Sequence, residues 1–439
     1  MRALHWLYPG LGFKRWVLLF GLGVLAAVAG VLRLLAPGWP LVGRVLAALG
    51  GPGAAGGVGM LGVGAGLITG SLVCGGRALR RTRAGRWDIG EYRRLRQAER
   101  GPRIVVVGGG SGLATLLRGL KEYTANLTAI VTVTDDGGSS GRLREDMGML
   151  PPGDIRNCLL ALADTEPIME RLFQHRFGPG HSMTGHNFGN LFIAAMTELS
   201  GDFEQAIQLF SQVLAVRGRV LPSTLADVRL RAVFADGSSL VGQTAITSRL
   251  LPIARVDLEP PHPPPLREVL AAMAEADAII LGPGSLYTSI LPNLLVSGVS
   301  AALRASPSLR IYICNVMTQP GETGGYRARD HVRAVMEVAG TGALDLVVMN
   351  DEDIPPERLL TYEEKGASPV LPDPDGVRAL GVPPHCAPLL SPSGLIRHDS
   401  RKLARVVMEA IDKSCTRRRM PRWNRRAVRR RDQEEAARV

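Results

Sequence analysis

The sequence predicts an α/β protein with a Rossmann-like, mostly parallel sheet, preceded by a two-helix transmembrane hairpin. Two observations predict the sheet: short apolar segments alternate with segments of helical spacing, and glycine-rich polar loops follow the apolar segments directly. Long uncharged segments before residue 77 predict the hairpin.

The amino-terminal region is apolar enough to cross a membrane twice. Residues 16–32 and 45–76 carry no charge, and one span needs about 20 largely apolar residues. Gly62, Gly66 and Gly70 recur every fourth residue and predict a smooth face that packs on the first span or on another copy of the chain. A flexible glycine-rich linker is the alternative interpretation of the second run.

Arginines after the second run predict the orientation. Five arginines occupy residues 77–86, against Arg33 and Arg44 between the two runs, and positive residues stay on the cytoplasmic side. The five scattered cysteines form no C-x-x-C pair, as expected in a reducing compartment. We expect a cell-membrane protein whose main domain lies in the cytoplasm; a cleaved signal peptide at the first run is the alternative.

The net charge of +12 is unevenly distributed along the chain. The flanking residues 1–76, 77–103 and 413–439 carry +5, +7 and +8, so residues 104–412 carry −8. A nucleic-acid-binding domain would carry a basic stripe on the fold itself, so we expect no specific nucleic-acid partner. The changes in charge and hydropathy along the chain predict four regions: a membrane hairpin at 1–76, a basic juxtamembrane linker at 77–102, a ligand-binding domain at 103–412 and a basic tail at 413–439.

The first predicted strand, residues 103–107, runs directly into a glycine loop and then a helix. Gly109, Gly110, Ser111 and Gly112 make this loop. Loops so poor in side chains let backbone N–H groups close on phosphate oxygens at the start of a helix.

The second predicted strand ends in a similar loop that contains Asp136, Gly138, Ser139 and Ser140. In an open α/β sheet the carboxyl ends of neighbouring strands are where ligands bind. The two loops therefore predict a site for a phosphorylated small molecule that carries a nucleotide.

A dehydrogenase is a competing interpretation of the glycine loop. Gly108 and Gly110 fit the first two places of G-x-G-x-x-G, but Leu113 occupies the third. Asp135 stands where an acid meets the ribose of NAD. Glycines that only make tight turns are a further alternative, which leaves the serines of the second loop unexplained.

The rest of the chain alternates between helical and strand patterns. Residues 228–234 and 240–246 flank a turn and predict a β-hairpin, and the proline run 259–265 predicts a break between two lobes or a surface crossing. Three segments with helical spacing predict a helical insertion after the second strand: 154–163, 187–199 and 203–213. Three later segments are typical of buried strands: 278–281, 310–314 and 344–349.

Two later strands also end in polar loops, which places four loops on one edge of the sheet and predicts a cleft. There Asn315 and Gln319 can read a base or sugar, and Tyr287 can stack on a ring. His186 lacks a histidine at helical i, i+4 spacing, so we favour hydrogen bonding or helix capping over zinc for its segment. Further candidate binding residues in these segments are Asn187, Asn190, Gly284, Ser285, Glu322 and Thr323.

Taken together, these motifs resemble the bacterial gluconeogenesis factor family of YvcK type. The resemblance covers residues 103–412 and includes the segments 151–157 and 185–190. It implies a Rossmann-like fold shared with the phospholactate transferase of deazaflavin coenzyme synthesis, and binding of UDP-sugars such as UDP-N-acetylglucosamine. It also implies a role in cell shape and wall precursor supply on gluconeogenic carbon, and adds Asp154 and Asn157 to the candidate binding residues.

Two functions remain as hypotheses. The first is a membrane-tethered UDP-sugar-binding regulator without catalytic residues, expected to be a homo-oligomer and to have a protein partner in wall precursor synthesis. The alternative is a transferase of the phospholactate transferase type, in which Asp135 and Asp136 hold Mg²⁺ beside the phosphates. The paired acids favour the transferase, and the lack of an activated nucleophile in the motif loops disfavours it. A scaffold that only docks partners leaves the four loops unexplained.

Overall fold

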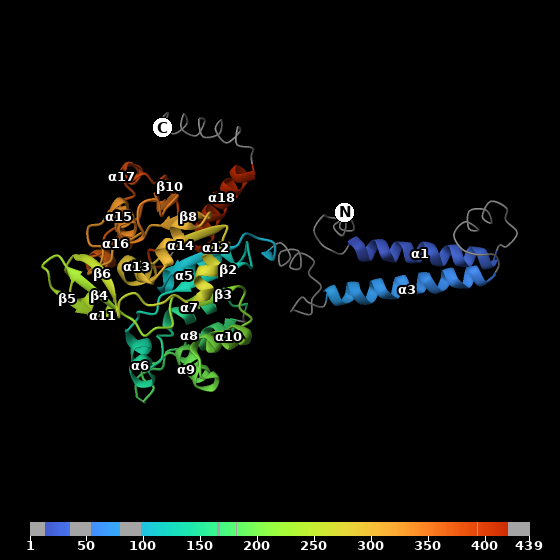
Figure 1. The fold of residues 1–439 in the computed structure, drawn as a ribbon, viewed down its shortest axis with the longest axis horizontal. Helices are drawn as coiled ribbons and strands as arrows, with labels where there is room; N and C mark the ends of the chain where they lie inside the picture. The colour runs from blue at the N-terminus through green and yellow to red at the C-terminus, as the bar shows by residue number, and fades with distance from the viewer. Residues whose placement is uncertain are drawn as a thin grey trace. The chain divides into compact units, whose positions relative to one another are not determined.

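The computed structural model describes residues 14–35, 54–79, 98–164, 167–180, 182–392 and 394–419. The chain forms two compact units, residues 1–99 and residues 100–439 (Figure 1). Most of the predicted basic linker and the tail beyond residue 419 lie outside the described residues.

The first unit is a pair of packed helices, α1 (Lys14–Leu35) and α3 (Ala54–Leu79). Their backbones touch at glycines: a Cβ atom on Gly23 would lie 3.0 Å from the carbonyl oxygen of Gly64, and one on Gly30 would lie 2.9 Å from that of Gly57. In each helix the two glycines are seven residues apart, about two turns, so both lie on one side. Small residues at these places allow the close approach.

The expectation that Gly62, Gly66 and Gly70 pack on the first span is wrong. A Cβ atom at any of the three would meet nothing within 4 Å. At 3.6 residues per turn they lie about 140° to 220° around α3 from Gly57, so they face away from α1. Packing of this face on another copy remains a prediction.

One described helix, α3, is long and apolar enough by length and composition to cross a membrane, over Gly57–Cys74. The apolar stretch of α1, Leu18–Leu32, is shorter. Two consecutive helical segments, Leu286–Leu295 and Val299–Ala305, are also long and apolar enough for a span when they are taken together, but the chain bends between them. Their apolar residues lie in the core of the second unit. The two-span membrane hairpin remains a prediction.

The second unit is built on a seven-stranded parallel sheet in the order β10-β9-β8-β7-β1-β2-β3. The order reverses at the centre, between β1 and β7, as in doubly wound α/β folds. This confirms the predicted α/β class. The strands are β1 (Ile104–Gly108), β2 (Leu127–Val131), β3 (Arg219–Pro222), β7 (Ala278–Leu281), β8 (Leu309–Ile313), β9 (Leu346–Asn350) and β10 (Pro384–Ala387).

The central strands are buried because helices cover both faces of the sheet. All five residues of β1, Ile-Val-Val-Val-Gly, are buried, as the continuous apolar run of a parallel strand requires. The edge strands β3 and β10 were not predicted from the sequence. Each is four residues long and carries a proline at one end, which conceals the strand pattern.

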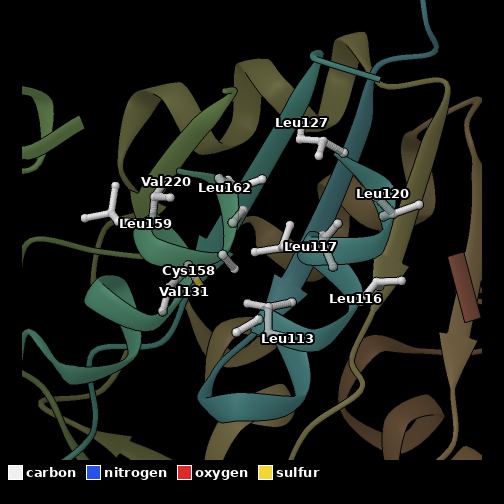
Figure 2. Packing of buried hydrophobic residues seen from close by; sticks show 14 of the residues in the cluster. Leu113, Leu116, Leu117, Leu120, Leu127, Val131, Cys158, Leu159, Leu162 and Val220 are labelled. Carbon is white, nitrogen blue, oxygen red and sulfur yellow. The ribbon is translucent and has the colours of Figure 1, made fainter. Parts of the chain in front are cut away.

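Two hydrophobic cores form, one on each face of the sheet. On one face α5 places Leu113, Leu116, Leu117 and Leu120 on a single helical stripe against α7 (Figure 2). Each of these leucines is fully buried and stabilises the fold by about 1.5–3 kcal/mol. The helices of this face include α5 (Gly110–Leu120), α7 (Gly153–Leu162) and α18 (Ser400–Arg419).

The opposite face of the sheet carries a second core. It includes residues of α12 (Arg267–Glu275), the π-helix η2 (Leu286–Ile290), α13 (Leu291–Leu295), α14 (Val299–Ala305), α15 (Ala328–Ala339) and α17 (Pro374–Ala379). One short helix, α16 (Pro356–Glu363), has no buried residue.

The predicted helical insertion is present between β2 and β3. Its last two helices begin at side-chain caps, where the side chains of Asn187 and Asp202 accept from the amides of Asn190 and Gln205. The insertion consists of α6 (Gly138–Met147), α7, α8 (Pro167–Gln174), α9 (Phe188–Ser200) and α10 (Phe203–Val213).

A small antiparallel sheet, β5-β4-β6, follows β3. The predicted hairpin is formed by β4 (Arg229–Phe234) and β5 (Ser239–Val241), and β6 (Ile253–Glu259) pairs on the other side. The prediction of a strand through residue 246 is wrong, because α11 (Gln243–Ser248) begins where the Asp136 carboxylate accepts from the amide and hydroxyl of Thr244. Residues 260–265 have no regular structure and lead from β6 back toward α12, as the proline run predicted.

Candidate functional site

A pocket of about 230 Å³ lies at the carboxyl ends of β1, β7 and β8, beside the point where the strand order reverses. Doubly wound proteins bind ligands in this crevice. The structure brings eight of the predicted site residues together in its lining: Gly109, Gly110, Ser111, Gly112, Gly284, Ser285, Asn315 and Gln319.

The glycine loop presents backbone amides to this pocket. Helix α5 begins at Gly110 and has no side-chain hydrogen bond at its cap, Gly109. The Gly110 amide donates to the Asp154 carboxylate, so the amides of Ser111 and Gly112 are the ones that an anion can reach. Gly110 has a φ of 68°, a conformation that favours glycine. A Cβ atom on Gly112 would lie 2.6 Å from the carbonyl oxygen of Pro283, so only glycine lets the β1 and β7 loops meet.

Three lining residues come from a segment that the sequence did not single out: Ile396, Arg397 and His398, between β10 and α18. Arg397 is exposed, and none of the residues that the structure describes forms a hydrogen bond or ion pair with its guanidinium. The other lining residues of the pocket carry no fixed charge. Arg397 therefore gives the pocket a positive charge beside the α5 amides.

His398 is buried in the wall of the pocket, with 7% of its surface exposed. Burial lowers the pKa of its imidazole to about 4, against a smaller opposing effect of the Cys314 carbonyl. Its Nε2 atom has no hydrogen-bond partner among the described residues. At neutral pH His398 is therefore an uncharged polar group.

A second group of predicted residues gathers where α6, α7 and α9 begin. The Arg156 guanidinium donates to Oδ1 of Asn190 and Oδ1 of Asn157, each at 2.8 Å. The Ser139 hydroxyl accepts from the Asn187 amide at 3.2 Å. This group of residues, together with His186, whose Nδ1 lies 3.4 Å from the Ser139 hydroxyl, is outside the lining of the pocket.

Asp154 lies between the pocket and this second group. A Cβ atom on Gly109 would lie 2.6 Å from Oδ2 of Asp154. Burial and, to a smaller extent, the nearby charge of Asp135 raise the pKa of this carboxyl from 3.8 to about 6, although the Gly110 amide and Arg156 oppose the rise. An acid titrating near neutral pH is thus placed beside the glycine loop.

The two carboxylates proposed for Mg²⁺ are turned to different partners. Asp135 accepts from the Gly137 amide at 3.1 Å, whereas Asp136 accepts from the Thr244 amide and hydroxyl at 2.9 and 2.7 Å. Within the described ranges no three His, Cys, Asp or Glu side chains gather as a metal-binding group. Mg²⁺ binding by this pair stays a prediction, and a further acid near Asp135 is Asp154.

Three predicted residues lie behind the pocket wall. Tyr287 is 5% exposed and its hydroxyl is 2.8 Å from that of Tyr326, and burial raises its pKa. Glu322 accepts from the Tyr287 amide and the Thr288 hydroxyl, and so ties the β7 loop to the β8 loop. The Thr323 hydroxyl accepts from the Gln319 amide at 2.9 Å. These residues hold the loops in place.

The fold and the pocket define a doubly wound α/β protein with an amide-lined crevice at its switch point. Residues 104–390 match the family described as 2-phospho-L-lactate transferase CofD. The gluconeogenesis factor of Bacillus subtilis (strain 168) is 49% identical over 311 residues, which cover 71% of this chain and 98% of that protein. The chain belongs to the gluconeogenesis factor family, related to this transferase.

Other relatives show which part of the chain the family shares. A relative from Nostoc sp. (strain PCC 7120) is 46% identical over 425 residues, 92% of this chain and 91% of that protein. A crystal structure of a UPF0052-family protein from Bacillus halodurans has a TM-score of 0.68 and 45% identity, and it covers 70% of this chain and 99% of that one. The second unit therefore corresponds to a whole protein in some relatives, and can be studied as a fragment of residues 100–439.

Proposed function

We propose that the second unit binds a UDP-sugar, of the kind of UDP-N-acetylglucosamine, and acts as a regulator. The observation that carries the proposal is that one pocket contains the α5 amides after Gly110 and the Arg397 guanidinium, which has no partner among the described residues. A diphosphate needs both features: amides that approach closely and a cation that neutralises charge.

The remaining lining is suited to the uncharged parts of such a ligand. The Gln319 amide donates to the Ser285 hydroxyl at 2.8 Å, and Asn315 accepts from the Gly284 amide at 3.4 Å. These residues and His398 present neutral hydrogen-bonding groups to a base or sugar. Ligand pockets commonly measure about 300–1,000 Å³, so part of the ligand would lie outside this pocket of about 230 Å³.

Calorimetry on the 100–439 fragment tests the proposal. Titration with UDP-N-acetylglucosamine, NAD and GDP, each with and without Mg²⁺, is expected to show binding of the UDP-sugar and its recovery unchanged after hours. Tighter binding of NAD would favour the dehydrogenase, and no binding of the UDP-sugar would overturn the proposal.

The alternative function is a Mg²⁺-dependent transferase. It is favoured by the match to the transferase family and by the neighbouring carboxylates of Asp135 and Asp154 at the glycine loop. Time-dependent release of UDP or UMP from a UDP-sugar by the parent fragment, abolished in Asp135→Asn, would establish the enzyme in place of the regulator.

The cellular part of the proposal follows from the family and from the first unit. We propose that the protein is tethered to the cytoplasmic membrane, acts with a partner in wall precursor supply, supports cell shape on gluconeogenic carbon, and forms homo-oligomers. A cysteine introduced near Pro40 is expected to react with an impermeant reagent in intact cells, and one near residue 393 is not. The reverse pattern would exclude a cytoplasmic domain.

A further inference from the structure

The position of Arg397 depends on the loop that carries it. Residues 390–392 and 394–398 belong to a narrow hairpin-like loop, closed by a bridge between Leu390 and His398 and by a hydrogen bond of 2.9 Å from the Ser391 amide to the Arg397 carbonyl. Since no described residue holds the Arg397 guanidinium, the backbone of this loop determines where its charge lies.

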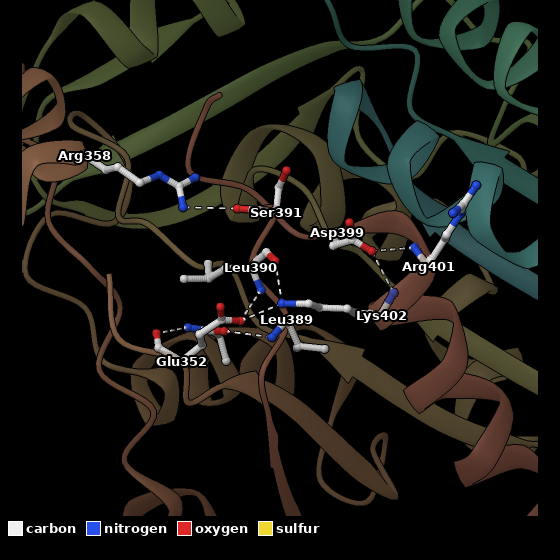
Figure 3. Close-up of polar contacts among 9 residues, drawn as sticks. Glu352, Arg358, Leu389, Leu390, Ser391, Asp399, Arg401 and Lys402 are labelled. Carbon is white, nitrogen blue, oxygen red and sulfur yellow. Dashed lines mark hydrogen bonds and ion pairs between the residues drawn. The ribbon is translucent and has the colours of Figure 1, made fainter. Parts of the chain in front are cut away.

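Helix α16 holds the tip of the loop. The Arg358 guanidinium donates from Nη1 to the carbonyl of Ser391 at 3.1 Å (Figure 3). Its Nη2 donates to the carbonyls of Gly394 and Leu395, each at 3.4 Å. The Tyr362 hydroxyl, one helical turn further on, accepts from the Ile396 amide at 2.9 Å. Two side chains of one helix therefore fix four backbone groups of the loop.

The base of the loop is held separately. Glu352 accepts from the Leu390 amide at 3.1 Å and from Nζ of Lys402 at 3.0 Å, and the same Nζ donates to the Leu390 carbonyl (Figure 3). Loss of the α16 contacts would thus free the tip, which carries Arg397, and leave the base in place.

Helix α16 is also linked to the pocket through a small separate hydrophobic cluster. Val316 and Met317 line the pocket and pack in this cluster with Ile396, and Leu359 and Tyr362 of α16 cover it. No residue of the helix is fully buried, and Leu359 and Tyr362 are half-buried. Its contacts therefore lie on the side that faces the loop and the pocket wall.

We propose that Arg358 is a positioning residue for anion binding, which acts through Arg397 without lining the pocket itself. The inference rests on the proposed function, because Arg397 is taken to bind the diphosphate. A planar guanidinium with five donors reaches several carbonyls at once, which an ammonium group on a flexible stem does not. Arg358→Lys should therefore retain the charge and lose most of the effect.

Titration of the 100–439 fragment with inorganic pyrophosphate tests this inference without reference to the nucleotide. Arg358→Gln is expected to weaken pyrophosphate binding about tenfold, and Tyr362→Phe to weaken it less. Arg397→Gln should weaken binding at least as much as Arg358→Gln. The double variant with Arg358→Gln and Arg397→Gln should bind pyrophosphate no more weakly than Arg397→Gln alone, because Arg358 acts through Arg397.

Hydrogen exchange separates positioning from a general loss of stability. Amides of residues 391–397 should exchange faster in Arg358→Gln, while those of β1 and β7 remain protected as in the parent. The matched control is Arg378→Gln, which removes an exposed ion pair to Asp375 on α17 and should change neither binding nor exchange.

The possible outcomes distinguish this inference from the proposed function. Additive losses in the double variant, or unchanged pyrophosphate affinity in Arg358→Gln, would overturn the positioning role. A parent fragment that binds no pyrophosphate would also overturn it. Binding of pyrophosphate without binding of UDP-N-acetylglucosamine would overturn only the nucleotide-sugar proposal.

Discussion

Replacing Asp154 by asparagine should stabilise the second unit at neutral pH. The carboxyl is placed beside Gly109 and Asp135, where burial and a like charge oppose its ionised form. Asparagine is nearly isosteric and keeps an acceptor for the Gly110 amide, so the main change is removal of the charge.

The magnitude follows from the shift in the pKa of Asp154 from 3.8 to about 6. One pKa unit corresponds to about 1.4 kcal/mol, so the ionised carboxylate costs up to about 3 kcal/mol above pH 6. Because the side chain retains partial exposure, we expect about 1–3 kcal/mol. The folded state binds this proton more tightly than the unfolded state, so the cost develops between about pH 4 and pH 6 and is absent below pH 4.

Urea unfolding of the 100–439 fragment between pH 4 and pH 7.5 measures this effect. The difference in unfolding free energy between Asp154→Asn and the parent should be near zero at pH 4 and reach its full value by pH 7. Asp375→Asn is the control, because its side chain is 92% exposed and its replacement should make little difference at any pH.

Two results would refute this reasoning. If Asp154→Asn destabilised the fragment at pH 7, the carboxylate would be held by contacts stronger than its burial penalty. If the gain in stability were the same at pH 4 and pH 7, it would not arise from ionisation.

Three other substitutions probe different parts of the structure. Gly112→Ala should destabilise the fragment by about 1–3 kcal/mol in urea unfolding, because a Cβ atom there collides with a backbone carbonyl, whereas Gly324→Ala, with nothing within 4 Å, should be neutral. Asp136→Asn should lower the free energy of unfolding by at most about 1 kcal/mol, since it weakens the cap of α11. Calorimetry should find its affinity for the UDP-sugar within tenfold of the parent, and loss of binding would indicate that Asp136 contacts the ligand. Gly64→Leu should lower the melting temperature of the full chain's helical pair in detergent, as followed by circular dichroism, and Gly66→Leu should not, because only Gly64 contacts the other helix.

The sequence was sufficient for features that depend on short stretches of chain. The apolar run before Gly109 and the polar loop after it predicted both the strand and its place at the binding edge, because strand, loop and helix are contiguous there. The same argument placed Gly284 and Asn315 correctly on that edge. Capping by Asn187 was also foreseen as one option for its segment.

Features that depend on contacts between distant segments were not predictable in this way. Arg397 follows β10, which a proline conceals, and no pattern near it indicates a pocket. Tyr287 and Glu322 have the right chemistry for a ligand, but the packing of two loops places the Tyr287 hydroxyl against Tyr326 and the Glu322 carboxylate against the backbone amide of Tyr287. The partner of Asp136 lies 108 residues further along the chain, and the sequence contains no sign of it.

The order in which the neighbours of strand β1 occur along the chain determines when the pocket can form during synthesis. Strand β1 pairs with β2 after a separation of 23 residues, but its other neighbour, β7, begins 174 residues later. The pocket also needs Arg397, and α18 must then settle against α5, where a Cβ atom on Gly119 would overlap the Ser400 carbonyl. During translation the pocket is therefore completed only after nearly all of the domain has left the ribosome, and by the proposed function a chain arrested before residue 397 would not bind a UDP-sugar.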